Sequence, residues 1–240
     1  MLVIVGSRHD PAVSDIVKQW AAWDVTLLSC EDLSIAGWRH RLGDSAGSQA
    51  VIGGAIVAER DIRGVLVRRP WIMDLELGHI ALEDREYVAA EINAFLTSWL
   101  VHLDCAVLNR PQGTCLCGPN WRPVQWVQAA SLLGIPAEPV RCSIPASDVR
   151  NISSEWPQES QREPPVEVTV VGNRCFGSPA AHYALSALKL AEFARTPLLA
   201  VRFREHCGSP RFISATAMPS LQDAEIASAV RDYLLSETAA

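Results

Sequence analysis

The first 28 residues predict a strand, a helix and a second strand, and this order constrains the fold more than any other feature. Leu2–Val5 and Val25–Leu28 are short apolar runs, and between them Asp10 can cap a helix that begins at Pro11. Neighbouring parallel strands need a crossover connection, which is usually a helix. We therefore expect an α/β fold with an N-terminal parallel sheet and flanking helices.

Apolar periodicity predicts more elements in the first 140 residues. Strands are expected at Ala50–Ile56, Gly64–Val67 and Cys105–Leu108, and helices at Glu83–Leu103 and Pro123–Leu133. The first of these helices has an apolar stripe that should face the core, formed by Tyr87, Ile92, Phe95, Leu96, Trp99 and Leu103. Gly53-Gly54 interrupts the first expected strand, and we interpret the pair as a bulge or a point of close packing.

The rest of the chain predicts a linker and a smaller α+β unit. Between Arg141 and Pro165 no period survives, and Ser, Pro, Glu, Gln and Arg dominate, as is typical of a linker or long surface loop. Beyond it we expect strands at Val166–Val171, Arg174–Phe176, Leu198–Phe203 and Arg211–Ala215, and helices at Ala181–Ala194 and Ala224–Leu235. The chain thus divides into residues 1–140, 141–165 and 166–240.

Composition excludes several classes of protein. The formal charge is −6, without a block of like charges, so a surface that follows nucleic-acid phosphates is not expected. The first residues lack a basic segment typical of a signal peptide, and no apolar stretch is long enough for a membrane span. Seven irregularly spaced cysteines in a chain of 240 residues favour reduced thiols and a cytoplasmic location.

Four short motifs occur in an order that resembles a known family. They are Arg68-Arg69-Pro70, Leu108-Asn109-Arg110-Pro111, Arg122-Pro123-Val124-Gln125 and Leu133-Gly134-Ile135-Pro136. Together they resemble the RimK-type ATP-grasp ligases, and most closely the branch that cross-links microviridin-type (graspetide) precursor peptides. The resemblance implies a pre-ATP-grasp-like domain at residues 1–140 and a minimal ATP-grasp-like core at 166–240.

The same resemblance implies that the ligase chemistry is lost. On its last strand the family carries a Glu-x-Asn pair that holds magnesium, and Ser214 and Thr216 stand at the matching positions. Magnesium prefers carboxylate oxygens, and neutral hydroxyls do not replace their charge. Val140–Pro165 has no lysine where the family's phosphate-gripping subdomain stands, and the chain is shortened again after Phe176. We expect no catalytic residue, no bound metal and no ATP cofactor.

Five residues remain as candidates for binding a substrate or partner. Arg68 and Arg69 follow a predicted strand and could present a guanidinium fork to a carboxylate, or could form a salt bridge with Glu76 or Glu83. Arg122 and Gln125 share a helix face, and Asn109 lies in a turn after a strand. Each of these three has either a binding role or a structural one, and for Asn109 the structural role is a bond to its own backbone.

Cysteine and tryptophan carry weaker signals. Cys115-Leu116-Cys117 lacks the other ligands of a tetrahedral metal site, and the six histidines form no triad. We expect core or incidental thiols at Cys105, Cys142, Cys175 and Cys207. Four tryptophans fit core faces, namely Trp20, Trp23, Trp99 and Trp126. Four others lie in loop-like segments and could anchor an interface, namely Trp38, Trp71, Trp121 and Trp156.

Three functions are compatible with these observations. The first is a degenerate ATP-grasp-like protein that acts as a binding or accessory subunit for a peptide or a modifying enzyme of a biosynthetic pathway. The second is an active ATP-dependent carboxylate-amine ligase with an atypical site that uses ATP and magnesium, in which Glu167, Glu205 and Asp223 would be the acids to suspect. The third is a homo-oligomeric structural protein whose exposed tryptophans form the interface.

Overall fold

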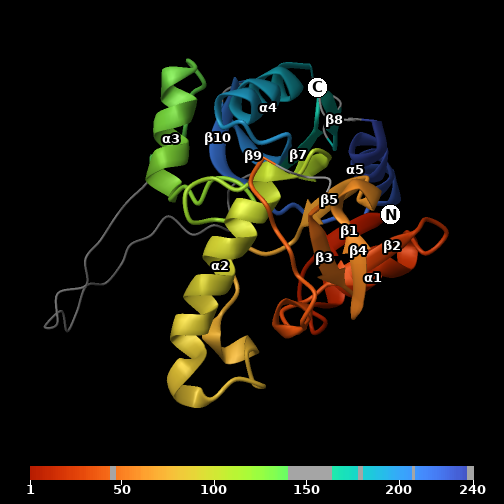
Figure 1. Ribbon diagram of the computed structural model, residues 1–240. Helices are drawn as coiled ribbons and strands as arrows, with labels where there is room; N and C mark the ends of the chain where they lie inside the picture. Colours follow the sequence, from red (N-terminus) through yellow and green to blue (C-terminus); the bar gives the residue numbers. More distant parts are fainter. Residues whose placement is uncertain (44–46, 140–163, 178–180, 207–208, 237–240) are drawn as a thin grey trace, which may run out of the picture.

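A computed structural model describes residues 1–43, 47–139, 164–177, 181–206 and 209–236. Within these ranges the strands form two four-stranded sheets and a two-stranded hairpin (Figure 1). The fold is therefore a mixed α/β fold, as predicted. The expected linker at 141–165 falls almost entirely outside the described residues.

The first sheet is parallel throughout and has the order β2-β1-β5-β6. Its strands are β1 (Leu2–Val5), β2 (Val25–Leu28), β5 (Gly64–Val67) and β6 (Ala106–Leu108). The crossover from β1 to β2 is α1 (Pro11–Gln19), and Asp10 caps it by accepting a 2.9 Å hydrogen bond from the Ala12 amide. The predicted β-α-β unit is confirmed.

The expected strand Ala50–Ile56 is wrong, because this segment is a hairpin. Its arms are β3 (Gln49–Ile52) and β4 (Ala55–Ala58), which pair antiparallel. Gly53 and Gly54 have φ of 60° and 79°, so they form the tight turn that needs two residues of positive φ. A Cβ on Gly53 would lie 2.7 Å from Thr26 Cγ2, so the expected close packing is present there. The sequence pattern did not predict the turn, because the arms on both sides of it are apolar.

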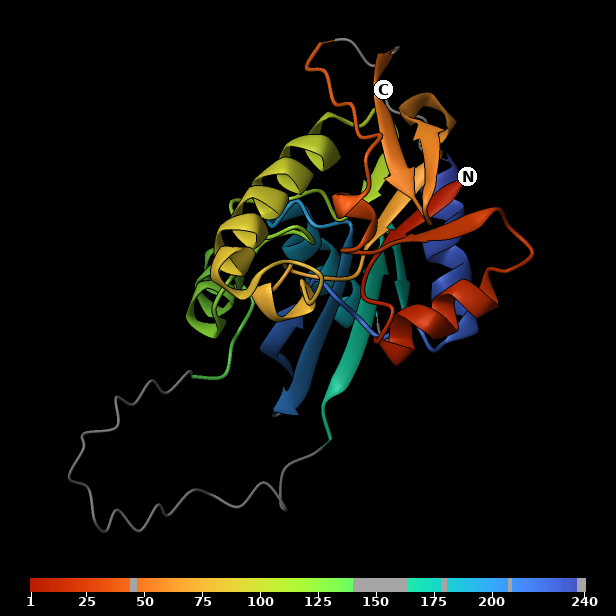
Figure 2. The same cartoon turned by 60° about the horizontal axis from the view of Figure 1, so that its bottom comes forward.

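Helices cover both faces of the first sheet. Figure 2 shows α2 (Arg85–His102) on one side and α1 with α5 (Ala224–Ser236) on the other. Successive strand residues point to opposite faces, so Val3 and Val65 pack in the cluster with α2, whereas Leu2 and Leu66 pack with α1 and α5. The sheet is thus buried on both faces, as is usual for parallel sheets.

Two aromatic residues lie outside the core that was predicted for them. Tyr87 is 68% exposed, because it lies in the first turn of α2, away from the buried stretch that includes Leu96 and Trp99. Trp23 is 43% exposed in the turn after α1, and the guanidinium of Arg231 lies 4.4 Å from its ring centroid. Periodicity identifies an apolar stripe, but it does not show where a helix extends past the sheet beneath it.

The other tryptophan predictions hold in part. Trp20, Trp99 and Trp126 are buried, as expected. Of the four in loop-like segments, Trp38 packs edge-on against Phe95 and Trp99, and Trp121 packs against Trp126. Trp71 is 42% exposed, whereas Trp156 lies outside the described residues.

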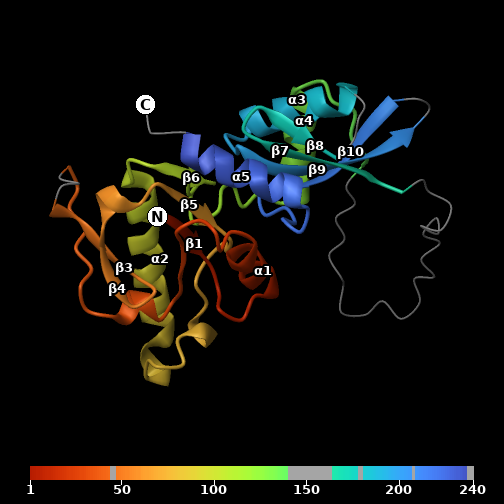
Figure 3. The same cartoon turned by 90° about the vertical axis from the view of Figure 1, so that its right-hand side faces the viewer.

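The second sheet is antiparallel, with the order β10-β9-β7-β8. Its strands are β7 (Val166–Val171), β8 (Arg174–Phe176), β9 (Leu198–His206) and β10 (Ser209–Thr216). On one face α4 (Ala181–Phe193) and α3 (Pro123–Leu132) pack against an apolar cluster of the sheet. Figure 3 shows α4 above the sheet and α5 below it, with the ends of β9 and β10 extending beyond α5.

Packing joins the two halves of the chain. Leu234 and Val230 of α5 pack against Leu2 and Ile4 of β1, although α5 lies at the far end of the sequence. Conversely, α3 lies before residue 140 but packs against the second sheet. The domain boundaries at 140 and 165 stay a prediction. Among the described residues, no helix is long and apolar enough to cross a membrane.

Candidate functional site

The face of the second sheet opposite α4 carries the positions for which a metal site was considered. Glu167 of β7 is directly opposite Arg202 of β9, which in turn is opposite Ser214 of β10. Thr216 is opposite Ala200 in the next row that points the same way. We treat these two adjacent rows together and call Glu167, Arg202, Ser214 and Thr216 the open-face row.

The charged members of this row are paired with each other. Arg202 Nε lies 3.7 Å from Glu167 Oε2, and the two side chains are 50% and 49% exposed. An ion pair this exposed stabilises the fold by less than about 1 kcal/mol, because water screens it. Because Arg202 and Glu167 carry opposite charges, the net charge of the open-face row is close to zero. Sequence reasoning missed Arg202, although its alternation with Arg204 along β9 placed it on this face.

The two hydroxyls of the row differ in exposure and bonding. Ser214 is half-buried and lies beside an irregularity in the pairing of β9 and β10 between Phe212 and Ser214. Thr216 is exposed, and its Oγ1 accepts a 3.2 Å hydrogen bond from the Met218 amide. Neither brings a carboxylate to the last strand. No group of three or more His, Cys, Asp or Glu side chains that could hold a metal occurs among the described residues.

Arg68 and Asn109 follow the carboxyl ends of β5 and β6, where open α/β sheets bind ligands. In this chain both side chains bond to the segment that follows β10 instead. Arg68 Nη1 donates to the carbonyl of Pro219 at 2.9 Å, and its Nε is buried with no hydrogen-bond partner among the described residues. Burial lowers the pKa of Arg68, while the charge of Asp10 opposes that shift.

Asn109 is the most extensively bonded of the five candidates. It is 1% exposed, and its Nδ2 donates to the carbonyls of Leu198 (2.9 Å), Ala217 (3.2 Å) and Cys117 (3.3 Å). Its Oδ1 accepts a 2.9 Å bond from the Leu198 amide. In place of the bond to its own backbone that was considered, Asn109 bonds to Cys117 and to two residues of the second half of the chain.

Arg69 is buried at 6% exposure and forms a salt bridge with Glu76, one of the two partners considered from the sequence. Within the part of the chain that the structure describes, its Nε and Nη1 are buried without a hydrogen-bond partner. Glu76 Oε2 also accepts a 3.0 Å hydrogen bond from the Met73 amide, so this pair anchors the segment after β5. The structure therefore separates Arg69 from Arg68, which bonds to a different part of the chain.

Arg122 and Gln125 lie at the start of α3, and both side chains are exposed. Gln125 Oε1 accepts a 2.8 Å hydrogen bond from the Arg122 amide and so satisfies a free donor at the helix terminus. This bond gives Gln125 a structural role. The Arg122 guanidinium stays a candidate for binding.

Cys115 and Cys117 are buried core thiols, with their sulfur atoms 3.6 Å apart. A hydrogen bond from Cys117 lowers the pKa of Cys115 to about 7, whereas the same bond and burial raise the pKa of Cys117.

The other two acids that were suspected for an atypical ligase site, Glu205 and Asp223, lie elsewhere on the second half of the chain. Asp223 accepts a 2.8 Å hydrogen bond from the Glu225 amide at the start of α5, and Glu205 is exposed on β9.

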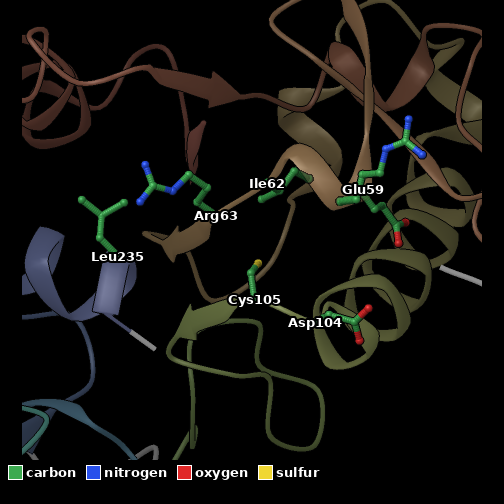
Figure 4. Close-up of a pocket in the computed structure, with 7 residues that line it drawn as sticks. Glu59, Ile62, Arg63, Asp104, Cys105 and Leu235 are labelled. Carbon is green, nitrogen blue, oxygen red and sulfur yellow. The ribbon is translucent and has the colours of Figure 1, made fainter. Parts of the chain in front are cut away.

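A cavity of about 330 Å³ lies at the opposite, amino end of the first sheet (Figure 4). It is lined by Glu59, Arg60, Ile62, Arg63, Asp104, Cys105 and Leu235. Burial raises the pKa of Glu59, and His40 and the Trp99 indole oppose the shift; the indole N–H donates to Glu59 Oε1 at 2.9 Å. Burial also raises the pKa of Cys105 to about 11, so this thiol stays protonated at neutral pH. None of the five binding candidates lines this cavity.

Neither a family model nor a curated protein matches this chain. Solved structures of peptide-modifying ligases do match it. Macrocyclase MdnC from Microcystis aeruginosa MRC, bound with precursor peptide MdnA, aligns with a TM-score of 0.65 and 11% identity over 98% of this chain and 99% of its own. ATP-grasp ligase PsnB, complexed with precursor peptide PsnA2 and AMPPNP, aligns at 0.68 and 10% over 97% and 98%.

A RimK domain ATP-grasp protein from Sphaerobacter thermophilus DSM 20745 also aligns, with a TM-score of 0.52 and 14% identity over 98% of this chain and 99% of its own. The fold of this chain is therefore that of the ATP-grasp proteins. Within that fold, the similar structures include the ligases of precursor peptides, so the expected resemblance is confirmed at the level of structure.

Proposed function

We propose that this chain is a catalytically degenerate protein of the ATP-grasp fold that acts as a binding or accessory subunit for a peptide or a peptide-modifying enzyme. One observation carries the proposal. Ser214, which the sequence resemblance puts at the position of a metal-binding acid, lies directly opposite the guanidinium-bearing Arg202.

The positive charge of Arg202 disfavours a metal ion beside Ser214. Side chains directly opposite each other on neighbouring strands have Cβ atoms about 5 Å apart. At roughly that distance a guanidinium and a magnesium ion repel each other by about 2–7 kcal/mol, for effective dielectric constants of about 80 to 20. Glu167 already pairs with Arg202, so the row offers little net negative charge to offset the repulsion. A magnesium ion is therefore held poorly at this face.

Peptide recognition is the part of the ligase function that does not need these ligands. MdnC and PsnB are both seen with precursor peptides. A protein that keeps their fold without the metal-binding acids retains a scaffold on which a peptide or a ligase subunit could dock. The pairing of Arg68 and Asn109 with the segment after β10 supports a fixed scaffold, because both tie the two halves of the chain together.

The first test is a titration of the protein with ATP and magnesium by calorimetry, with a parallel measurement of the melting temperature. A ligand that binds only the folded state raises that temperature. We expect no heat of binding and no shift. Magnesium-dependent binding in the micromolar range would overturn the proposal, and ATP turnover with a carboxylate and an amine would establish the active ligase in its place.

A triple variant tests the observation itself. Arg202→Gln, Ser214→Glu and Thr216→Asn together remove the cation and restore the ligases' acid and amide. We expect this variant to bind Mn²⁺ measurably more tightly than the parent protein, as followed by the electron spin resonance of free Mn²⁺. No gain would show that the face lacks the geometry of a metal site, and the central observation would lose its force. Separately, the native host should yield a peptide or modifying enzyme bound to the protein.

A further inference from the structure

An exposed surface with both apolar and acidic side chains surrounds the start of α2. We call it the acidic-apolar surface, and it belongs to residues 71–91. Its exposed apolar members are Trp71 (42%), Met73 (48%), Leu75 (80%), Leu82 (76%) and Tyr87 (68%). Its exposed acidic members are Asp74, Glu83, Asp84, Glu86 and Glu91. In Figure 1 this segment forms the lower end of the molecule, around the tip of α2.

The concentration of apolar side chains in this segment is unusual for the chain. Fourteen large apolar side chains are exposed among the described residues, and five of them lie between Trp71 and Tyr87. Single exposed apolar residues are normal on a soluble protein, but a group of them marks an interaction site.

The backbone beneath these side chains is firmly held. Two short helical turns, η4 (Asp74–Glu76) and η5 (Leu82–Asp84), pack against α2. Ile72 is buried at 3% exposure, and its amide and carbonyl both bond to the Asn93 side chain, at 2.8 and 2.9 Å. Leu77 is fully buried. The exposed side chains are therefore presented on a fixed scaffold.

The segment carries nearly the whole net charge of the protein. Residues 71–91 contain six acids and one arginine, a net charge of −5 if the histidine is neutral, compared with −6 for all 240 residues. Glu76 turns inward to Arg69, and the guanidinium of Arg85 donates to the carbonyls of Ile80 and Gly78. The five remaining acids face solvent.

We propose that the acidic-apolar surface docks a basic, amphipathic polypeptide segment of a partner protein. Burial of the apolar side chains supplies affinity, and the acids steer and orient a segment rich in Lys or Arg. A second copy of this chain fits poorly, because a symmetric contact would bring two sets of acids together. The acidic-apolar surface lies at α2, which covers the first sheet, whereas the open-face row lies on the second sheet. The inference therefore holds whether or not the open-face row binds nucleotide.

The test uses a fluorescein-labelled helical peptide of 18 residues made of Leu and Lys as probe. Binding is followed by fluorescence anisotropy. Two matched peptides serve as comparisons, one with Glu in place of Lys and one with Ser in place of Leu. We expect the Leu/Lys peptide to bind at least tenfold more tightly than either, and its affinity to fall as salt is raised from about 50 to 500 mM, since salt screens exposed charges.

Paired variants locate the contact. Leu75→Ser with Leu82→Ser should weaken binding by about tenfold or more, because each leucine loses burial in the complex. Glu83→Gln with Glu86→Gln should weaken it several-fold and flatten the salt dependence. The control is Leu185→Ser with Glu192→Gln on α4, where both side chains are also exposed, and we expect no change. All these side chains lie at the surface, so unchanged melting temperatures should confirm folding.

Three results would overturn the inference. The first is equal affinity for the Leu/Lys and Leu/Glu peptides, and the second is an equal loss of binding in the α4 control. The third is self-association of the parent protein, measured by sedimentation, that Leu75→Ser with Leu82→Ser abolishes. That last result would identify the surface as an interface between copies of this chain.

Discussion

Replacement of Asn109 by alanine should destabilise the protein far more than its turn-like sequence context suggests. The side chain is 1% exposed and receives a hydrogen bond from the Leu198 amide, while it donates to three carbonyls. Loss of a partner for one buried donor costs about 1–3 kcal/mol. The carbonyls that lose a donor add to this cost, so we expect a total loss of about 3 kcal/mol in the free energy of unfolding.

Urea unfolding followed by circular dichroism measures this loss. For a slope of about 2–3 kcal/mol per molar, the midpoint should fall by about 1–1.5 M. Asn109→Asp keeps the shape and the acceptor but places an oxygen against the three carbonyls, so its loss should equal or exceed that of the alanine variant. Asn173→Ala, in the exposed turn between β7 and β8, is the matched control and should change stability by less than about 0.5 kcal/mol. A loss below about 1 kcal/mol in Asn109→Ala would refute the reasoning.

Two further predictions concern the N-terminal half. Burial raises the pKa of Glu59 above its ordinary value of 4.5, so this carboxyl contributes stability below that pH and loses it as pH rises through the folded value. Relative to Glu59→Gln, the parent protein should therefore lose unfolding free energy as pH rises above about 4.5; a constant difference would contradict this. Gly54→Ala should cost about 1 kcal/mol for its φ of 79°, and Gly53→Ala about 3 kcal/mol, because its Cβ would also meet Thr26. Equal losses in thermal unfolding would show that the Thr26 contact is unimportant.

Local patterns predicted most of the elements correctly. The cap at Asp10 and the hairpin at Gly172-Asn173 depend on interactions within a few residues, which the sequence displays directly. The β-α-β unit joins strands that are neighbours along the chain, so the order of its elements predicted it. The failures also have local causes. The Gly53-Gly54 turn lies between two apolar arms. Trp23 lies in the turn after α1, and Tyr87 lies in the first turn of α2, away from its buried stretch.

The candidate site depended more on distant parts of the chain. The sequence by itself determined which residues bear charge and hydrogen-bonding groups, and it indicated that Ser214 and Thr216 stand where the ligases carry an acid and an amide. Only the tertiary structure decided their neighbours. Arg68 bonds to a carbonyl 151 residues away, Asn109 bonds to one 108 residues away, and Ser214 meets Arg202 through the pairing register of β9 and β10. A residue's type fixes what it can bind, but the register of strands and the packing of helices fix what lies within its reach.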